Sequence, residues 1–118
     1  MRLGEVSLCT NDVGRLADFY KSVLGVDNQS NDAVHQFILS EETALTIYND
    51  GSVKNNDNQN ICLAFTVDDV DAEYERLSAL GVEIIEAPQT RPWGARNMHV
   101  RDPDGNHIYF RSIPSDRL

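Results

Sequence analysis

The stretch VSLCTNDV, at residues 6–13, is repeated in outline by LAFTVDDV at residues 63–70. In each stretch the first five residues suit a β-strand, and the amide or acidic residues that follow are typical of the start of an α-helix. A helical pattern of apolar residues then runs to Gly25 in the first half and to Gly81 in the second. The chain is therefore predicted to contain two modules built on one plan.

The two predicted helices have defined ends and one apolar face each. Asn11 or Asp12, and likewise Asp68 or Asp69, can accept hydrogen bonds from the free amides of the first helical turn. Glycine after the last turn can take the left-handed conformation that ends a helix. The apolar residues recur every three or four positions, so each helix should cover one face of a sheet. They are Leu16, Phe19, Tyr20, Val23 and Leu24, then Tyr74, Leu77 and Leu80.

Further strands are predicted after each helix. The first half offers a hairpin of residues 37–40 and 44–48, and the second offers strands at 82–87, 96–101 and 107–113. We therefore expect an α+β fold of two βαβββ modules. The expected organisation is a single domain at 1–118, with module one at 1–50, a polar linker at 51–59 and module two at 60–118.

Composition narrows the class of protein. The 118 residues suit one ordinary globular domain, and the apolar runs are too short to span a bilayer. The N-terminus lacks the long apolar stretch of a secretory signal, so we expect a cytoplasmic protein. Cys9 and Cys62 form no Cys-x-x-Cys pair, which argues against a structural zinc site. A net charge of -9 disfavours nucleic acid and anionic membranes as partners.

The charge is unevenly distributed along the chain. Residues 91–111 contain four arginines and two aspartates, so the net charge of this window is +2 and that of the rest of the chain is -11. The acidic remainder fits either a solvated surface or a cleft for cationic ligands. The basic window lies in the segment expected to line a site, and this weakens the case for a cleft that binds cationic ligands.

Four short patterns occur in a characteristic order and spacing. They are Phe19-Tyr20-x-x-x-Leu24-Gly25, Asp68-Asp69-Val70-Asp71, Pro92-Trp93-Gly94-x-Arg96 and Asp102-Pro103-Asp104-Gly105-Asn106, the last followed by the strand residues HIYF. Together they resemble the vicinal oxygen chelate superfamily of glyoxalase I, the extradiol dioxygenases and the bleomycin resistance proteins, with the closest likeness to the bleomycin-resistance-like branch. The resemblance implies a curved mixed sheet around a cavity shared by the two modules, and a homodimer.

In metal-dependent members of that superfamily, each module places one metal ligand on its first strand and one on its last. The corresponding positions here are Glu5 and Cys62, counted from the helix caps, together with Thr46 and Tyr109; Thr46 could be displaced by one residue. Threonine and neutral tyrosine are poor ligands, and a lone thiolate has no second soft partner. We expect no metal and no cofactor, with Glu5 the only plausible retained ligand.

Strand alternation suggests which side chains face the cavity. The predicted ligand-binding residues are Glu5, Ser7, Thr46, Tyr48, Cys62, Trp93, His99 and Tyr109. These residues could instead simply fill the interior, with Tyr109 bonded to Glu5. His99 and His107 could act as a general base or be merely solvated. Trp93 could stack on a planar ligand or anchor its loop.

The leading functional prediction is a metal-independent protein that binds or sequesters a small organic ligand as a homodimer, with no catalytic residue assigned. One alternative is a metal-dependent lyase or dioxygenase that uses Glu5 and a histidine such as His99 or His107. Another is an interaction module without a small ligand.

Overall fold

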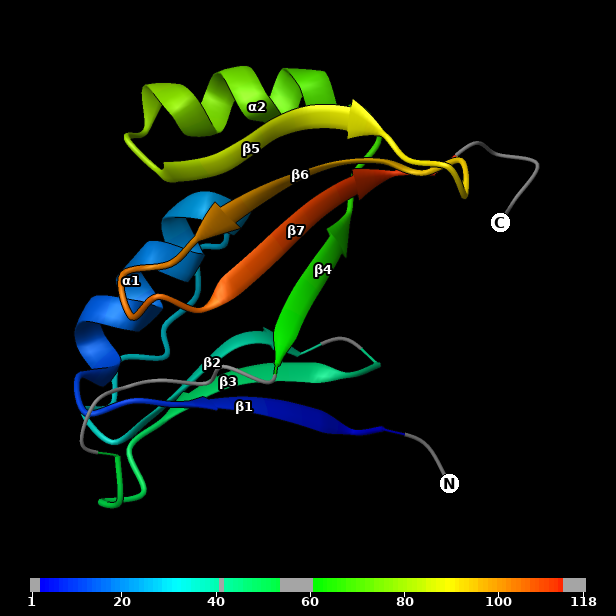
Figure 1. The fold of residues 1–118 in the computed structure, drawn as a ribbon. Coiled ribbons are helices and arrows are strands. Elements are labelled where there is room, and N and C mark those ends of the chain that lie inside the picture. Colours follow the sequence, from blue (N-terminus) through cyan, green and yellow to red (C-terminus); the bar gives the residue numbers. More distant parts are fainter. Residues whose placement is uncertain (1–2, 41, 54–60, 114–118) are drawn as a thin grey trace. The chain divides into compact units, whose positions relative to one another are not determined.

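The computed structural model describes residues 3–40, 42–53 and 61–113. In chain order its elements are β1 (Glu5–Cys9), α1 (Val13–Leu24), β2 (His35–Ser40), β3 (Ala44–Tyr48), β4 (Cys62–Thr66), α2 (Val70–Ala79), β5 (Glu83–Thr90), β6 (Arg96–Arg101) and β7 (His107–Ser112). They form two compact units, Met1–Asn58 and Gln59–Leu118, each with its own sheet and helix (Figure 1). The predicted α+β class with mixed sheets is confirmed.

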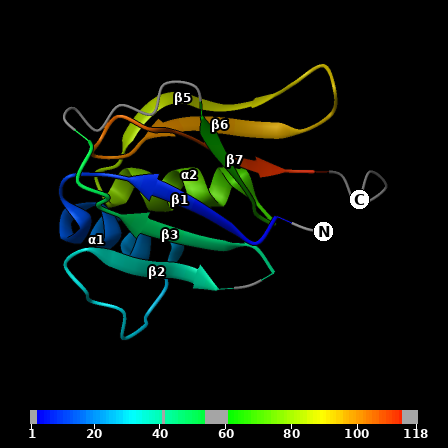
Figure 2. The same ribbon diagram turned by 90° about the horizontal axis from the view of Figure 1, so that it is seen from below.

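Unit one has a sheet with strand order β1-β3-β2, which Figure 2 shows side by side. β1 and β3 are parallel, with Ser7 opposite Thr46, whereas β2 and β3 are antiparallel. A parallel pair needs a crossover connection, and α1 provides it. The helix packs on β2 and β3 and buries Leu16 and Tyr20, while Leu8 and Ile47 are buried from the sheet.

Residues 26–34 of unit one follow α1 without an assigned strand, so this unit is βαββ in its described residues. Local hydrogen bonds explain the difference from the second half. The Asn28 side chain accepts from the Ser30 amide at 3.0 Å, and Asp32 accepts from the amides of Val34 and His35 at 2.8 and 2.9 Å. Such turns occupy backbone amide groups that would otherwise form hydrogen bonds between β-strands.

Unit two has the strand order β4-β7-β6-β5. β4 and β7 are parallel, again joined through a helix, and the other neighbours are antiparallel. β5 extends to Thr90, three residues beyond the predicted strand, in a long hairpin with β6. α2 lies along β5 (Figure 1), also contacts β6 and β7, and buries Val70 and Leu77.

The helix ends largely follow the sequence pattern. Of the two candidates at each start, Asp12 and Asp69 are the caps, and their carboxylates accept from the amides of Arg15 and Ala72 at 3.2 and 3.1 Å. α1 ends at Gly25 with φ 66°, as predicted. Leu80 was predicted to join the buried face of α2, which is wrong: it caps the helix and is 51% exposed.

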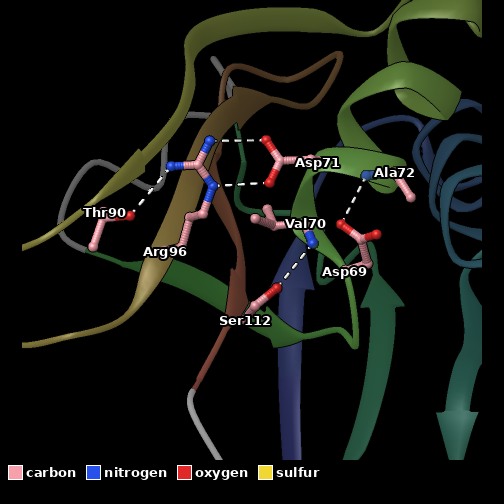
Figure 3. Close-up of polar contacts among 7 residues, drawn as sticks. All are labelled: Asp69, Val70, Asp71, Ala72, Thr90, Arg96 and Ser112. Carbon is pink, nitrogen blue, oxygen red and sulfur yellow. Dashed lines mark hydrogen bonds and ion pairs between the residues drawn. The ribbon is translucent and has the colours of Figure 1, made fainter.

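The first turn of α2 is tied to the sheet by side chains (Figure 3). The Val70 amide donates to the Ser112 hydroxyl of β7 at 2.8 Å. Arg96, the first residue of β6, donates to both carboxylate oxygens of Asp71 at 2.8 and 2.9 Å, and to the Thr90 hydroxyl at 3.2 Å. This contact lowers the pKa of Asp71 and fixes the base of the loop at 91–95.

The turn between β6 and β7 is organised around a buried carboxylate. Asp102 Oδ1 accepts from the amides of Asp104 and Asn106 at 2.9 and 2.8 Å, and Oδ2 accepts from Asn106 Nδ2 at 2.6 Å. Gly105, with φ 84°, donates its amide to the Asp102 carbonyl at 2.9 Å. The closing turn of the predicted hairpin is thereby set by one side chain.

No helix in the described ranges is both long enough and apolar enough to cross a membrane.

Asp102→Ala removes the acceptor for three hydrogen bonds, one of them donated by the side-chain amide of the buried Asn106. We expect the free energy of unfolding, measured by urea denaturation, to fall by at least about 3 kcal/mol. Asp68→Ala, at an exposed acidic position, should change it by less than about 0.5 kcal/mol. Equal effects of the two substitutions would contradict this account of the turn.

Candidate functional site

Unit two contains an open cleft of about 680 Å³ on one face of its sheet. The side chains of β6 and β7 alternate: Met98, Val100, Ile108 and Phe110 are buried, whereas Asn97, His99, Tyr109 and Arg111 line the cleft. Cys62 and Ala64 of β4 line it beside them. The alternation expected from the sequence therefore holds for this sheet.

Two stacked rings stand in the cleft. His99 and Tyr109 are cross-strand partners, and their ring centroids lie 4.5 Å apart with planes 10° from parallel. On the other side of Tyr109, its partner in β4 is Ala64, whose side chain is a single methyl group. Tyr109 therefore has one ring face covered by an imidazole and a small neighbour on the opposite side.

His99 is also joined to the imidazole of His107. The two nearest ring nitrogens, His99 Nε2 and His107 Nδ1, are 2.7 Å apart and share one proton as donor and acceptor. Burial lowers the pKa of His99 from its ordinary 6.5, and the nearby positive charges of His107, Arg101 and Arg91 lower it further. The alternative that His99 is simply solvated is wrong.

The charged side chains of the cleft differ in their partners. Arg91 forms an ion pair with Glu86, and its Nε donates to Asn97 Oδ1 at 2.8 Å. Arg111 donates from Nε to the Thr66 hydroxyl at 3.1 Å. A neutral hydroxyl orients the guanidinium without offsetting its charge.

Trp93 lies in the loop between β5 and β6 and lines the cleft while remaining 62% exposed. The loop is closed by two hydrogen bonds, from the Arg91 amide to the Ala95 carbonyl at 2.8 Å and from the Gly94 amide to the Arg91 carbonyl at 2.9 Å. Gly94 has φ 99°, a conformation open mainly to glycine. The indole is thus carried on a short, defined loop.

Unit one has a second, smaller hollow of about 500 Å³, lined by Glu5, Ser7, His35 and Tyr48. Beneath it, the fully buried Thr46 donates its hydroxyl proton to Glu5 Oε2 at 2.7 Å. A hydroxyl has only one proton, so the 3.0 Å contact between Thr46 and Ser7 is donated by Ser7. His35 Nε2 lies 3.7 Å from Glu5 Oε2.

The predicted site residues thus divide between the two units. Cys62, Trp93, His99 and Tyr109 line the cleft, and Glu5, Ser7 and Tyr48 line the hollow above Thr46. Sequence reasoning did not select His35, Arg91, Asn97 or Arg111. Alternation alone places Arg111 beside Tyr109 and Asn97 beside His99, each two residues away on its own strand, and this signal was available. His35 and Arg91 depend on the register of β2 with β3 and on the β5–β6 hairpin, which alternation along one strand does not give.

The donor set of the four superfamily positions does not fit a divalent metal. Glu5 is bonded to a hydroxyl and is near one imidazole, and Tyr109 is stacked on His99. Within the residues that the structure describes, no group of three or more His, Cys, Asp and Glu side chains is close enough to share an ion. Such sites normally use three or four ligands.

Two mixed sheets, each with a parallel strand pair joined through a helix, place the protein among folds built from repeated β-α-β modules. The chain belongs to the Glyoxalase/Bleomycin resistance protein/Dioxygenase superfamily, whose family model matches residues 2–110. The resemblance read from the sequence motifs is confirmed.

Individual relatives agree with this assignment. The protein YraH of Bacillus subtilis (strain 168) is 33% identical over an alignment 122 positions long, which covers 92% of this chain and 95% of YraH. A glyoxalase-related enzyme from Fulvimarina pelagi matches with TM-score 0.80 at 21% identity, covering 97% of this chain and 89% of that one. Lactoylglutathione lyase from Agrobacterium tumefaciens matches with TM-score 0.74 at 22% identity, covering 94% and 92%. At such identities the two structures establish the fold alone.

His107→Gln should raise the pKa of His99 toward 6.5, because one of the positive charges that lower it is removed while burial remains. In the wild type, the lowered pKa means that stability is lost as the pH falls from about 6.5 through the folded-state value. NMR titration of the imidazole protons measures both effects. Tyr109→Phe, which keeps the stacked ring, should leave the pKa of His99 nearly unchanged. A lower His99 pKa in His107→Gln would refute the charge argument.

Proposed function

We propose that the protein binds a small organic ligand in the unit-two cleft and holds or sequesters it without a metal. The observation that carries this proposal is the cleft itself, with stacked rings at Tyr109 and a few placed polar groups. Its volume lies within the roughly 300–1,000 Å³ typical of small-molecule sites. Family membership supports a binding scaffold but does not name the ligand.

Within this proposal, Cys62, Trp93, His99 and Tyr109 contact the ligand. Trp93 offers an exposed indole at the cleft, suited to covering a planar group. Glu5, Ser7 and Tyr48 form a second candidate contact surface in unit one, and the fully buried Thr46 beneath it holds Glu5 through its hydroxyl rather than contacting a ligand itself.

One observation favours a second candidate, a metal-dependent lyase or dioxygenase. Glu5 and His35 lie 3.7 Å apart and are side chains of the types that hold zinc, nickel or iron. They supply only two ligands, which is why we rank this function below ligand binding.

Metal analysis and ligand screening separate these functions. Protein purified without chelator should carry far less than one equivalent of nickel, zinc, iron or manganese. A panel of flat aromatic acids, amides and amines should include compounds that change Trp93 fluorescence in a saturable way. The dissociation constants of these compounds should be the same with and without EDTA. Because Trp93 is the only tryptophan, the signal reports on the cleft.

Stoichiometric metal that is lost in Glu5→Ala would overturn metal-independent binding and favour the second candidate. If no compound changes the fluorescence or raises the melting temperature, the remaining interpretation is an interaction module without a small ligand.

We also propose that the protein is a homodimer, as the superfamily resemblance implies. Sedimentation equilibrium should give twice the 13.2 kDa mass of one chain at micromolar concentration. A mass of 13.2 kDa across that range would exclude a stable dimer.

A further inference from the structure

The cleft of unit two carries one positive charge that its own residues do not neutralise. Its charged lining residues are Arg91, Arg111 and Glu86. Glu86 is engaged by Arg91. In the part of the chain that the structure describes, no carboxylate forms an ion pair with Arg111, whose Nε is bonded to the neutral Thr66 hydroxyl. The terminal amino groups of Arg111 are therefore the strongest anion-binding feature in the cleft.

The position of the stacked rings defines where a third ring fits. His99 lies across the strand from Tyr109 on the β6 side, and the two rings are nearly parallel. Their stacking direction thus runs across the sheet, and the second face of Tyr109 is directed toward β4. There the partner residue is Ala64, an exposed position whose methyl group leaves room above it. Strands are about 4.8 Å apart, close to the spacing of stacked rings.

Arg111 lies at one end of the space above Ala64 in which a third ring would fit. It follows Tyr109 by two residues on the same face of β7, which corresponds to roughly 7 Å along the strand. Thr66, which accepts the hydrogen bond from Arg111, follows Ala64 by two residues on β4. A ring seated above Ala64 would therefore have the guanidinium at its edge, within reach of a substituent on the ring.

We propose that the cleft selects a flat aromatic ring bearing a negatively charged group, with the ring above Ala64 against Tyr109 and the anion at Arg111. This inference rests on the proposed function and specifies the ligand class. A carboxylate matches the paired donors of a guanidinium, whereas a cationic substituent would meet like charge. The acidic chain as a whole repels anions, so the selectivity arises locally, in the basic window at residues 91–111.

Three probes of one shape test the charge preference: 2-naphthoate, 2-naphthamide and 2-naphthylmethylammonium. Binding is measured by calorimetry and by the indole N–H signal of Trp93 in ¹H–¹⁵N NMR spectra. We expect 2-naphthoate to bind at least about tenfold more tightly than the amide, and the ammonium compound to bind weakest.

Variants test the two parts of the proposed site, which are the anion contact at Arg111 and the ring position above Ala64. Arg111→Gln should weaken 2-naphthoate about tenfold, to the level of the amide, and leave the amide itself unchanged. Arg101→Gln is the matched control, because it removes the same charge from the neighbouring strand at a residue that does not line the cleft, and it should change affinity less than about threefold. Ala64→Leu should weaken all three probes by filling the ring position. Arg111→Lys, which keeps the charge but not the paired donors, should give an intermediate affinity and serves if Arg111→Gln does not fold.

The outcomes distinguish this inference from the proposed function. Equal affinity of the three probes for the wild type would overturn the anion preference and leave ligand binding standing. Equal losses in Arg111→Gln and Arg101→Gln would likewise overturn the role of Arg111. Failure of every probe to bind would count against both proposals.

Discussion

In each unit the first strand lies parallel to the last, and the remaining structure depends on this pairing. Parallel neighbours cannot be joined by a tight turn, so the chain must cross over, and a helix makes that crossing in both units. The helix covers one face of its sheet. The period of two along each strand then assigns every second side chain to the opposite face, where the cleft and the hollow lie.

The same plan produces two faces of different chemistry. In unit one a carboxylate, Glu5, is stabilised by the Thr46 hydroxyl and lies near an imidazole. In unit two a guanidinium, Arg111, is oriented by the Thr66 hydroxyl. Each charged group is thus held by a threonine on the strand paired in parallel with its own. The fold fixes the positions of the side chains on the sheet face opposite each helix, and the sequence determines their charge.

Local sequence signals predicted the parts of the fold that local physics controls. The aspartate caps, the glycine after α1 and the alternating strands were all readable, because each depends on residues close in sequence. The irregular segment at 26–34 was not resolved into its turns, since Asn28 and Asp32 fit several loop conformations. Leu80 fitted the helical period, but the helix ends one residue earlier.

The candidate site was predicted in part for a related reason. Alternation correctly placed Tyr109 and His99 on the open face, yet their stacking and the hydrogen bond to His107 depend on the register between strands. Arg91 reaches Asn97 because the β5–β6 hairpin brings the start of β6 back beside the end of β5. Contacts of this kind are set by tertiary pairing, which the period of one strand does not contain.

The turn built around Asp102 also bears on the chemical ageing of the chain. An Asp-Gly pair such as Asp104-Gly105 is prone to isomerise when the glycine nitrogen attacks the preceding side-chain carboxyl, because glycine offers little steric resistance. Here that nitrogen donates a hydrogen bond to the Asp102 carbonyl, and the Asp104 amide is held by the Asp102 carboxylate. These hydrogen bonds must break before the turn can rearrange for that attack, so the interaction that shapes the hairpin should also slow isomerisation at Asp104-Gly105.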